Sequence, residues 1–182
     1  MLRITHLLAV IVIASAVPAC TSGDEPASSS NEAALTTDEA QTLDLTKLPP
    51  DWKVLKGTPP GVTAIAIPAG PVGRSATCPS GTVCLFQNEN RGGSGIAFAL
   101  APNTFINLTD FACPGCNNGL HGNNGTWNDQ MTSWENASGV QYCWTFDINA
   151  VGEVHFMNPG VSLQNVLPRE NDEASGIDRL GC

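Results

Sequence analysis

Charged residues are scarce in this chain, and lysine is almost missing from it. Of the 182 residues, 14% are charged, and 8 basic against 17 acidic side chains give a formal net charge of −9. The lysines are Lys47, Lys53 and Lys56, so no lysine after residue 56 can contribute to a basic groove for a polyanion. We therefore expect no nucleic-acid partner.

Long hydrophobic runs are missing as well. The one apolar run of note extends from Leu7 to Val17 and is too short to span a bilayer. Arg3 precedes this run, and the small-residue tripeptide Val17-Pro18-Ala19 ends it. This is the pattern of an export signal that is removed from the mature protein, so we predict a signal peptide over residues 1–19.

The cysteine count is odd, which leaves one thiol over in an exported protein. Bacterial lipoprotein signals place a cysteine directly after such a tripeptide, and Cys20 holds that position. A lipid on Cys20 would leave six cysteines for three disulfides in an oxidising compartment. We predict an extracytoplasmic lipoprotein that meets the membrane only through this anchor. Ordinary cleavage before Cys20, giving a secreted protein with a free thiol, is the alternative.

Residues 20–77 contain few large apolar side chains that could form a core. The stretch from Thr21 to Thr46 is rich in Ser, Thr, Ala and acids and has no aromatic residue. In residues 47–77, Trp52 and the alternating segment GVTAIAIP could form a strand that packs on the following domain, but prolines recur there, at positions 49, 50, 59, 60, 68 and 71. We predict a flexible, acidic and proline-rich tether over 20–77.

Residues 78–182 lack helical periodicity of useful length and instead show short β-type runs between turn clusters. The runs are TVCLFQ, GIAFAL, FINLTDF, TSWENA, QYCWTF, EVHFM, VSLQNV and SGIDRL. About eight strands at this spacing predict an all-β domain, a sandwich of antiparallel sheets. A weak repeat aligns VCLFQNENRGG with YCWTFDINAVG and GTWNDQMTSW with PRENDEASGI, which predicts two four-strand Greek keys.

These motifs resemble the βγ-crystallin superfamily and, within it, the Streptomyces metalloproteinase inhibitor family of secreted peptidase inhibitors. The resemblance covers 78–182 and is carried by CPSGTVC, the following LFQNENRGG, NLTD at 107–110 and GTWNDQMTS at 125–133. The sequence departs from the crystallin hairpin pattern at Arg91 in the first copy and at Thr145 and Ala150 in the second, where aromatic residues are lost. The insert between Asp110 and Trp127 is longer than the family's and could form a protruding loop.

The resemblance implies a disulfide-braced, βγ-crystallin-like sandwich that inhibits an extracellular protease, of the thermolysin type. It also implies disulfides Cys78–Cys84 and Cys143–Cys182, which leaves Cys113 to pair with Cys116 by elimination. The bond offered to the protease would lie between Cys143 and Trp144, with Trp144 exposed to fill an apolar pocket. The alternative is that Trp144 is a core aromatic on a strand.

Calcium is the one cofactor that the resemblance brings in, and none is otherwise required. Family members bind it through paired N/D-N/D-x-x-S/T-S motifs; residues 128–133 match fully, and residues 171–176 match except for Gly176 in the last position. The implied ligands are Asn128, Asp129, Gln130 and Thr132 with Asn171, Asp172, Glu173 and Ser175. Their oxygens suit a hard cation. The alternative is that both motifs are Asx-turns that cap strands.

No catalytic motif is found, so we expect a monomeric binding protein and not an enzyme. The histidines His121 and His155 belong to no nucleophile elbow, zinc-protease helix or carboxylate pair. Two other functions stay open: a calcium-stabilised envelope module without a protease target, and a redox lipoprotein that uses the CPGC sequence at 113–116. The second lacks the βαβ context that lowers a thiol pKa, so a structural disulfide is favoured.

Overall fold

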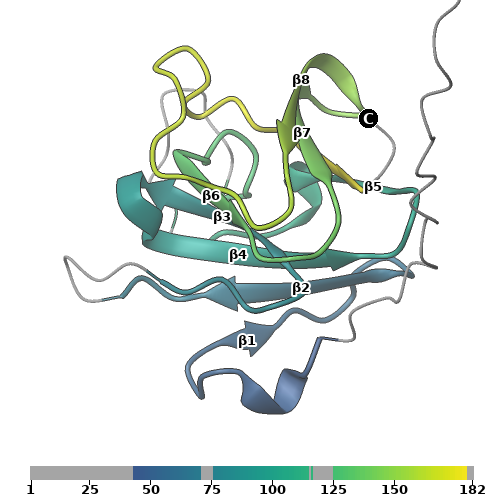
Figure 1. Ribbon diagram of the computed structural model, residues 1–182, viewed down its shortest axis with the longest axis vertical. Coiled ribbons are helices and arrows are strands. Elements are labelled where there is room, and N and C mark those ends of the chain that lie inside the picture. Colours follow the sequence, from purple (N-terminus) through teal and green to yellow (C-terminus); the bar gives the residue numbers. More distant parts are fainter. Residues whose placement is uncertain (1–42, 71–75, 115, 117–124, 180–182) are drawn as a thin grey trace, which may run out of the picture. The chain divides into compact units, whose positions relative to one another are not determined.

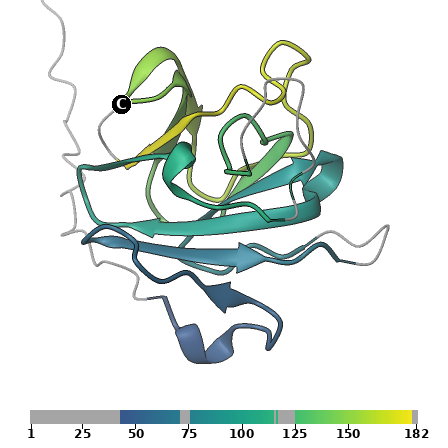
Figure 2. The ribbon, with the colours of Figure 1, turned by 180° about the vertical axis from the view of Figure 1, so that it is seen from behind.

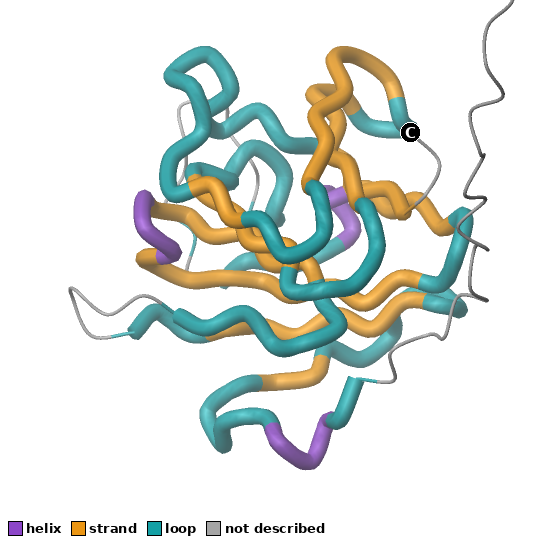
Figure 3. The backbone as a smooth tube through the Cα atoms, in the orientation of Figure 1, coloured by secondary structure: helices purple, strands orange, loops and turns teal. Residues whose placement is uncertain are grey.

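The computed structural model describes residues 43–70, 76–114, 116 and 125–179, and within these ranges the regular structure is β-strand apart from three short 3-10 turns (Figure 3). No helix in this part of the chain is long and apolar enough to cross a membrane. The strands are β1 Lys53–Val54, β2 Val62–Ile67, β3 Val83–Asn88, β4 Gly92–Leu100, β5 Thr104–Asn107, β6 Ser133–Asn136, β7 Tyr142–Asp147, β8 Val151–Met157, β9 Ser162–Leu163 and β10 Gly176–Arg179. The 3-10 turns are η1 Leu45–Lys47, η2 Glu89–Arg91 and η3 Leu108–Asp110.

The strands form two antiparallel sheets (Figures 1 and 2). The six-stranded sheet has the order β1-β2-β4-β3-β6-β9, and the four-stranded sheet has the order β5-β10-β7-β8. Each of the eight β-type runs in 78–182 overlaps one of the strands β3 to β10. The predicted all-β class is therefore confirmed.

The strand order defines two Greek keys that exchange their third strands. The first key is β3-β4-β5-β6, but β5 leaves it and pairs with β10 in the other sheet. The second key is β7-β8-β9-β10, and β9 correspondingly pairs with β6. Each sheet therefore needs both halves of the repeat, which confirms the predicted sandwich of two Greek-key motifs.

The main core lies between the two sheets and takes alternate residues from each strand. Leu85 and Phe98 of the six-stranded sheet and Trp144 and Ile177 of the four-stranded sheet belong to it, and none is more than 1% exposed. Strand β3 is buried on both faces: Leu85 points into this core, whereas its neighbour Phe86 packs into a second cluster on the outer side of the six-stranded sheet. This explains why the strand reads as a continuous apolar run.

The second cluster corrects the predicted tether. Strand β2 pairs along its whole length with β4, and Ile65 and Ile67 are buried against Phe86, with Leu48 and Trp52 packed at the margin. The prolines flank the strand and do not interrupt it, because residues 61–67 contain none. Residues 53–67 are thus part of the folded domain. Of the two interpretations of this segment, a strand that packs on the domain is correct, and a flexible tether is wrong for these residues.

Two hairpins turn through unusual backbone. Between β3 and β4, Asn90 and Arg91 have φ of 55° and 60°; between β7 and β8, Asn149 and Ala150 have φ of 61° and 58°. This left-handed conformation is costly for residues with a Cβ, and each first strand shifts register just before the turn. The two hairpins therefore repeat the same backbone conformation, although the aromatic residues of the repeat are lost.

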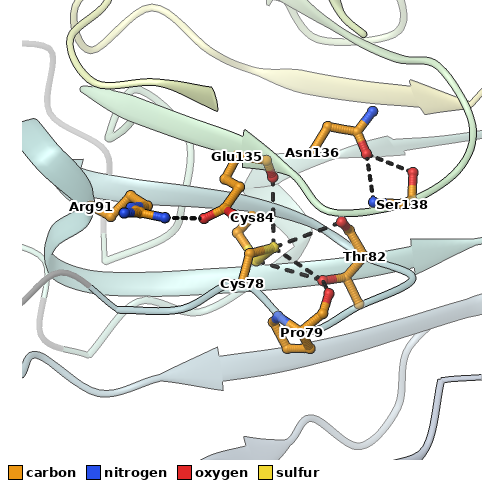
Figure 4. The surroundings of a disulfide bond; sticks show 8 residues. All are labelled: Cys78, Pro79, Thr82, Cys84, Arg91, Glu135, Asn136 and Ser138. Carbon is orange, nitrogen blue, oxygen red and sulfur yellow. Dashed lines mark hydrogen bonds and ion pairs between the residues drawn. A yellow bond between two sulfur atoms is a disulfide. The ribbon is translucent and has the colours of Figure 1, made fainter. Parts of the chain in front are cut away.

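Two predicted disulfides are present among the described residues. Cys78–Cys84 spans Cα atoms 5.8 Å apart, and Cys113–Cys116 spans 5.3 Å. Figure 4 shows Thr82 beside the first, with its hydroxyl donating to the carbonyl of Pro79 at 2.7 Å. Cys143 is also disulfide-bonded, and its predicted partner Cys182 lies outside the described residues, as do Cys20 and residues 1–42.

Candidate functional site

The two N-D motifs meet in space although 43 positions separate them in the sequence. Asp129 and Asp172 both adopt the left-handed conformation, with φ of 56° and 60°. The N–H of Asp129 donates to the carbonyl of Ala174 at 3.0 Å, and the N–H of Asp172 donates to the carbonyl of Met131 at 3.2 Å. Each motif thus donates one main-chain hydrogen bond to the other.

Several predicted ligand oxygens gather at this junction. The hydroxyl of Ser175 donates to Oδ1 of Asp129 across the two motifs at 3.2 Å. Within each motif the leading asparagine donates its amide to the next aspartate, Asn128 to Asp129 and Asn171 to Asp172. Oδ1 of Asn128 is buried and accepts no hydrogen bond. A buried acceptor without a partner lowers the stability of the fold unless a cation or a water molecule binds to it.

An open pocket of about 660 Å³ lies beside the junction. Thr132 and Asn171, one from each motif, line it together with Asn88 and Glu89 from the β3–β4 hairpin. The donor set is oxygen throughout, which suits calcium. These residues therefore fit a hard cation. The remaining predicted ligands, Gln130 and Glu173, directly follow Asp129 and Asp172 in the sequence, and the Gln130 side chain is buried.

The predicted protease-contact bond is not on the surface. Cys143 and Trp144 are each 1% exposed and lie in β7, which is paired on one side with β10 and on the other with β8. The indole of Trp144 stacks on His155, with ring centroids 4.2 Å apart. An exposed Cys143–Trp144 bond is therefore a wrong expectation, because a central strand has its backbone groups engaged on both sides.

The exposed apolar residues instead gather in a later segment. Nine large hydrophobic side chains are exposed in the described ranges, and seven lie between residues 148 and 167: Ile148, Val151, Val154, Phe156, Val161, Leu163 and Leu167. Strand β8 carries three of them and is the edge of its sheet. Phe156 is 54% exposed and Val154 41%, and the two share a face because they are two positions apart. The sequence pattern alone could not separate this edge strand from the buried β7.

Main-chain pairing beside the second disulfide joins the two ends of the long insert. Cys113 is 3% exposed, its N–H donates to the carbonyl of Gly125 at 2.7 Å, and Ala112 forms a β-bridge with Thr126. With Cys113 buried and Cys116 partly buried, the disulfide is better suited to a structural role than to that of an exposed redox pair. Residues 117–124, including His121, lie outside the described residues.

One polar cluster escaped sequence reasoning. The sequence places His155 in no catalytic motif, but Glu153 on the same strand and Glu170 from a distant loop converge on it. Arg169 holds both oxygens of Glu153 at 2.8 Å. Its guanidinium lowers the pKa of the Glu153 carboxyl and has its own pKa raised in return. The i, i+2 spacing of Glu153 and His155 was the only signal of this cluster in the sequence.

The two Greek keys and their exchanged strands give the domain a βγ-crystallin-like fold. Residues 73–157 match the family model of peptidase inhibitor family I36, a range that runs from the segment before β3 to the end of β8. This confirms the resemblance to a βγ-crystallin-fold family of peptidase inhibitors. No curated protein gives a significant match to the chain.

Solved structures of βγ-crystallin domains are similar at low identity. One, from work on the evolution of the eye lens βγ-crystallin domain fold, shares 15% identity over 65% of this chain and 95% of its own, with a TM-score of 0.44. A domain from Clostridium beijerinckii shares 20% over 54% and 95%, with a TM-score of 0.38. One from Flavobacterium johnsoniae shares 23% over 55% and 97%, also at 0.38. The strand order, and not these likenesses, defines the fold.

Proposed function

We propose that the protein is a non-enzymatic inhibitor of an extracellular protease, with a thermolysin-type metalloprotease as its target. The observation that carries this proposal is the match of residues 73–157 to a peptidase inhibitor family. The disulfide-braced fold supports it, since a rigid inhibitor loses little conformational entropy on binding. The family match and the disulfides together also suggest an extracellular site of action.

Strand β8 is the part of the described surface that best suits such contact. A protease cleft holds its substrate as an extended chain, and β8 is an extended edge strand whose outer backbone groups face away from β7. The other edge strands are shorter: β1 and β9 have two residues each, and β5 has four, against seven in β8. Val154 and Phe156 supply the apolar side chains that thermolysin-type pockets select.

Inhibition assays test this proposal directly. The purified protein should slow cleavage of a peptide substrate by thermolysin in a dose-dependent manner. Phe156→Asp should weaken inhibition at least tenfold, whereas Leu45→Asp, at a side chain that is 46% exposed in η1, should leave it unchanged. If the protein inhibits neither thermolysin-type nor other extracellular proteases, the proposed function is overturned. Equal inhibition by both variants would overturn β8 as the contact.

A second candidate function is calcium binding between the N-D motifs, as in an envelope module with no protease target. The reciprocal cross-links of Asp129 and Asp172 and the buried acceptor of Asn128 favour it. Asp129→Ala and Asp172→Ala should each abolish the rise in melting temperature that calcium produces, because binding to the folded state stabilises it by mass action. A calorimetric titration without heat and melting curves without a calcium shift would exclude this candidate.

The protein is further proposed to be a monomeric lipoprotein held by Cys20, with the segment before the folded domain as its spacer. Attached acyl chains give stable anchoring when two or more are present. Cys20→Ser should move the protein from the membrane fraction to the medium. Wild-type protein that is already soluble in the medium would instead support simple secretion.

A further inference from the structure

The strongest unassigned feature is the cluster of Glu153, His155 and Glu170 beside the β8 edge. Each residue offers one ligand atom, and these atoms all lie within 4.8 Å of one another. We propose that this cluster is a binding site for a divalent transition metal ion of the zinc type, separate from the N-D motifs and independent of the inhibitor function.

The ring of His155 lies beside two carboxylates, but its Nε2 makes no hydrogen bond. Nε2 of His155 is buried and makes no hydrogen bond, although Oε1 of Glu153 stands 3.2 Å away. Nδ1 lies 3.6 Å from Oε1 of Glu170, which is longer than a normal hydrogen bond. A buried ring nitrogen without a hydrogen bond costs free energy, and an ion held by Nε2 and a carboxylate oxygen would remove that cost.

The ligand side chains are held in place before an ion arrives. The His155 ring stacks on Trp144 at 4.2 Å and on Phe146 at 5.2 Å between centroids, with interplanar angles of 12° and 16°. Glu170 is 6% exposed, and its Oε2 accepts the N–H of Leu167 at 3.1 Å. Such supporting contacts orient metal ligands and raise the affinity of a site.

The donor set selects the metal. One imidazole nitrogen and two carboxylate oxygens suit zinc and its neighbours, whereas calcium prefers oxygen ligands alone. The Glu153 side chain is 44% exposed, so water can reach the cluster. Arg169 opposes binding, because its guanidinium contacts Oε1 of Glu153 at 2.8 Å and lies 3.7 Å from Glu170. Two carboxylates against one guanidinium still leave the pocket with a net negative charge.

Cobalt(II) serves as the spectroscopic probe for this site. The exported protein, purified without a histidine tag and treated with iodoacetamide to block any free thiol, is titrated with Co²⁺ alone, and Zn²⁺ is then added in competition. We expect one Co²⁺ per chain, visible d–d absorption, displacement by Zn²⁺ and no displacement by excess Ca²⁺. Zinc should also raise the melting temperature.

Matched variants decide the outcome. His155→Phe keeps the aromatic stack but removes both nitrogens, and it should weaken binding at least tenfold, as should Glu170→Gln. Glu135→Gln, at a partly buried carboxylate that pairs with Arg91, should bind as the wild type does. Arg169→Ala should bind more tightly, because a competing positive charge is gone. Absent binding, or equal binding by His155→Phe, would overturn the site whether or not the protein inhibits a protease.

Discussion

At the scale of single residues, Trp144 shows most clearly what its surroundings decide. It is 1% exposed and stacked on His155, so Trp144→Ala should lower the free energy of unfolding by about 3–5 kcal/mol through lost burial and a new cavity. Urea unfolding followed by circular dichroism measures this. The matched control Phe156→Ala, at a ring that is 54% exposed, should cost less than about 1 kcal/mol. A loss that small for Trp144→Ala would contradict its place in the core.

Asn136 is a second residue whose role is set by burial. Its side chain is fully buried, and its amide donates to the carbonyls of Val140 at 2.8 Å and Met157 at 2.7 Å, while its oxygen accepts the N–H and hydroxyl of Ser138. Asn136→Ala should cost about 2–4 kcal/mol, because buried groups lose their partners. Asn158→Ala, at an exposed asparagine bonded to Gln141, is the control. Equal stability of the two variants in the same unfolding assay would refute this role.

At the scale of elements, the pairing of β2 makes residues 62–67 part of the domain. It pairs with β4 and buries Ile65 and Ile67 on the outer side of the six-stranded sheet. Ile65→Ala should therefore cost about 2–5 kcal/mol, whereas Val54→Ala in β1, at a side chain that is 43% exposed, should change stability by less than about 0.5 kcal/mol. Thermal melting of both variants tests this. If Ile65→Ala melts with the wild type, the segment is dispensable as a tether would be.

At the scale of the whole molecule, the cysteine pairing is the main covalent constraint. Cys78–Cys84 and Cys113–Cys116 are present, and we expect Cys143 to pair with Cys182, which ties the start of the second Greek key to the C-terminus. Peptide mapping without reduction should recover all three pairs. A Cys78–Cys182 or Cys113–Cys143 peptide would refute this connectivity. Replacing both Cys78 and Cys84 by alanine removes the disulfide that closes this short loop, and it should lower the free energy of unfolding by about 2 kcal/mol.

Much of the fold was predictable because β-strand periodicity and turn residues act locally. The runs VCLF and YCWTF mark β3 and β7, and the repeat between them predicts two Greek keys. The paired N-D motifs were predictable for the same reason, since a six-residue pattern sets an Asx-rich turn. The family resemblance then supplied the pair Cys78–Cys84, and elimination supplied Cys113–Cys116; the structure contains both.

The sequence by itself therefore determined the all-β class, the two halves and the residues that form each turn. Only the tertiary structure decided which strand is central and which is an edge, so it buried Trp144 and left Phe156 exposed. It also brought Glu170 to His155 and Ile65 to Phe86. The physical reason is that strand exchange and sheet order depend on contacts between residues far apart in the chain, and local patterns of hydrophobicity carry no information about them.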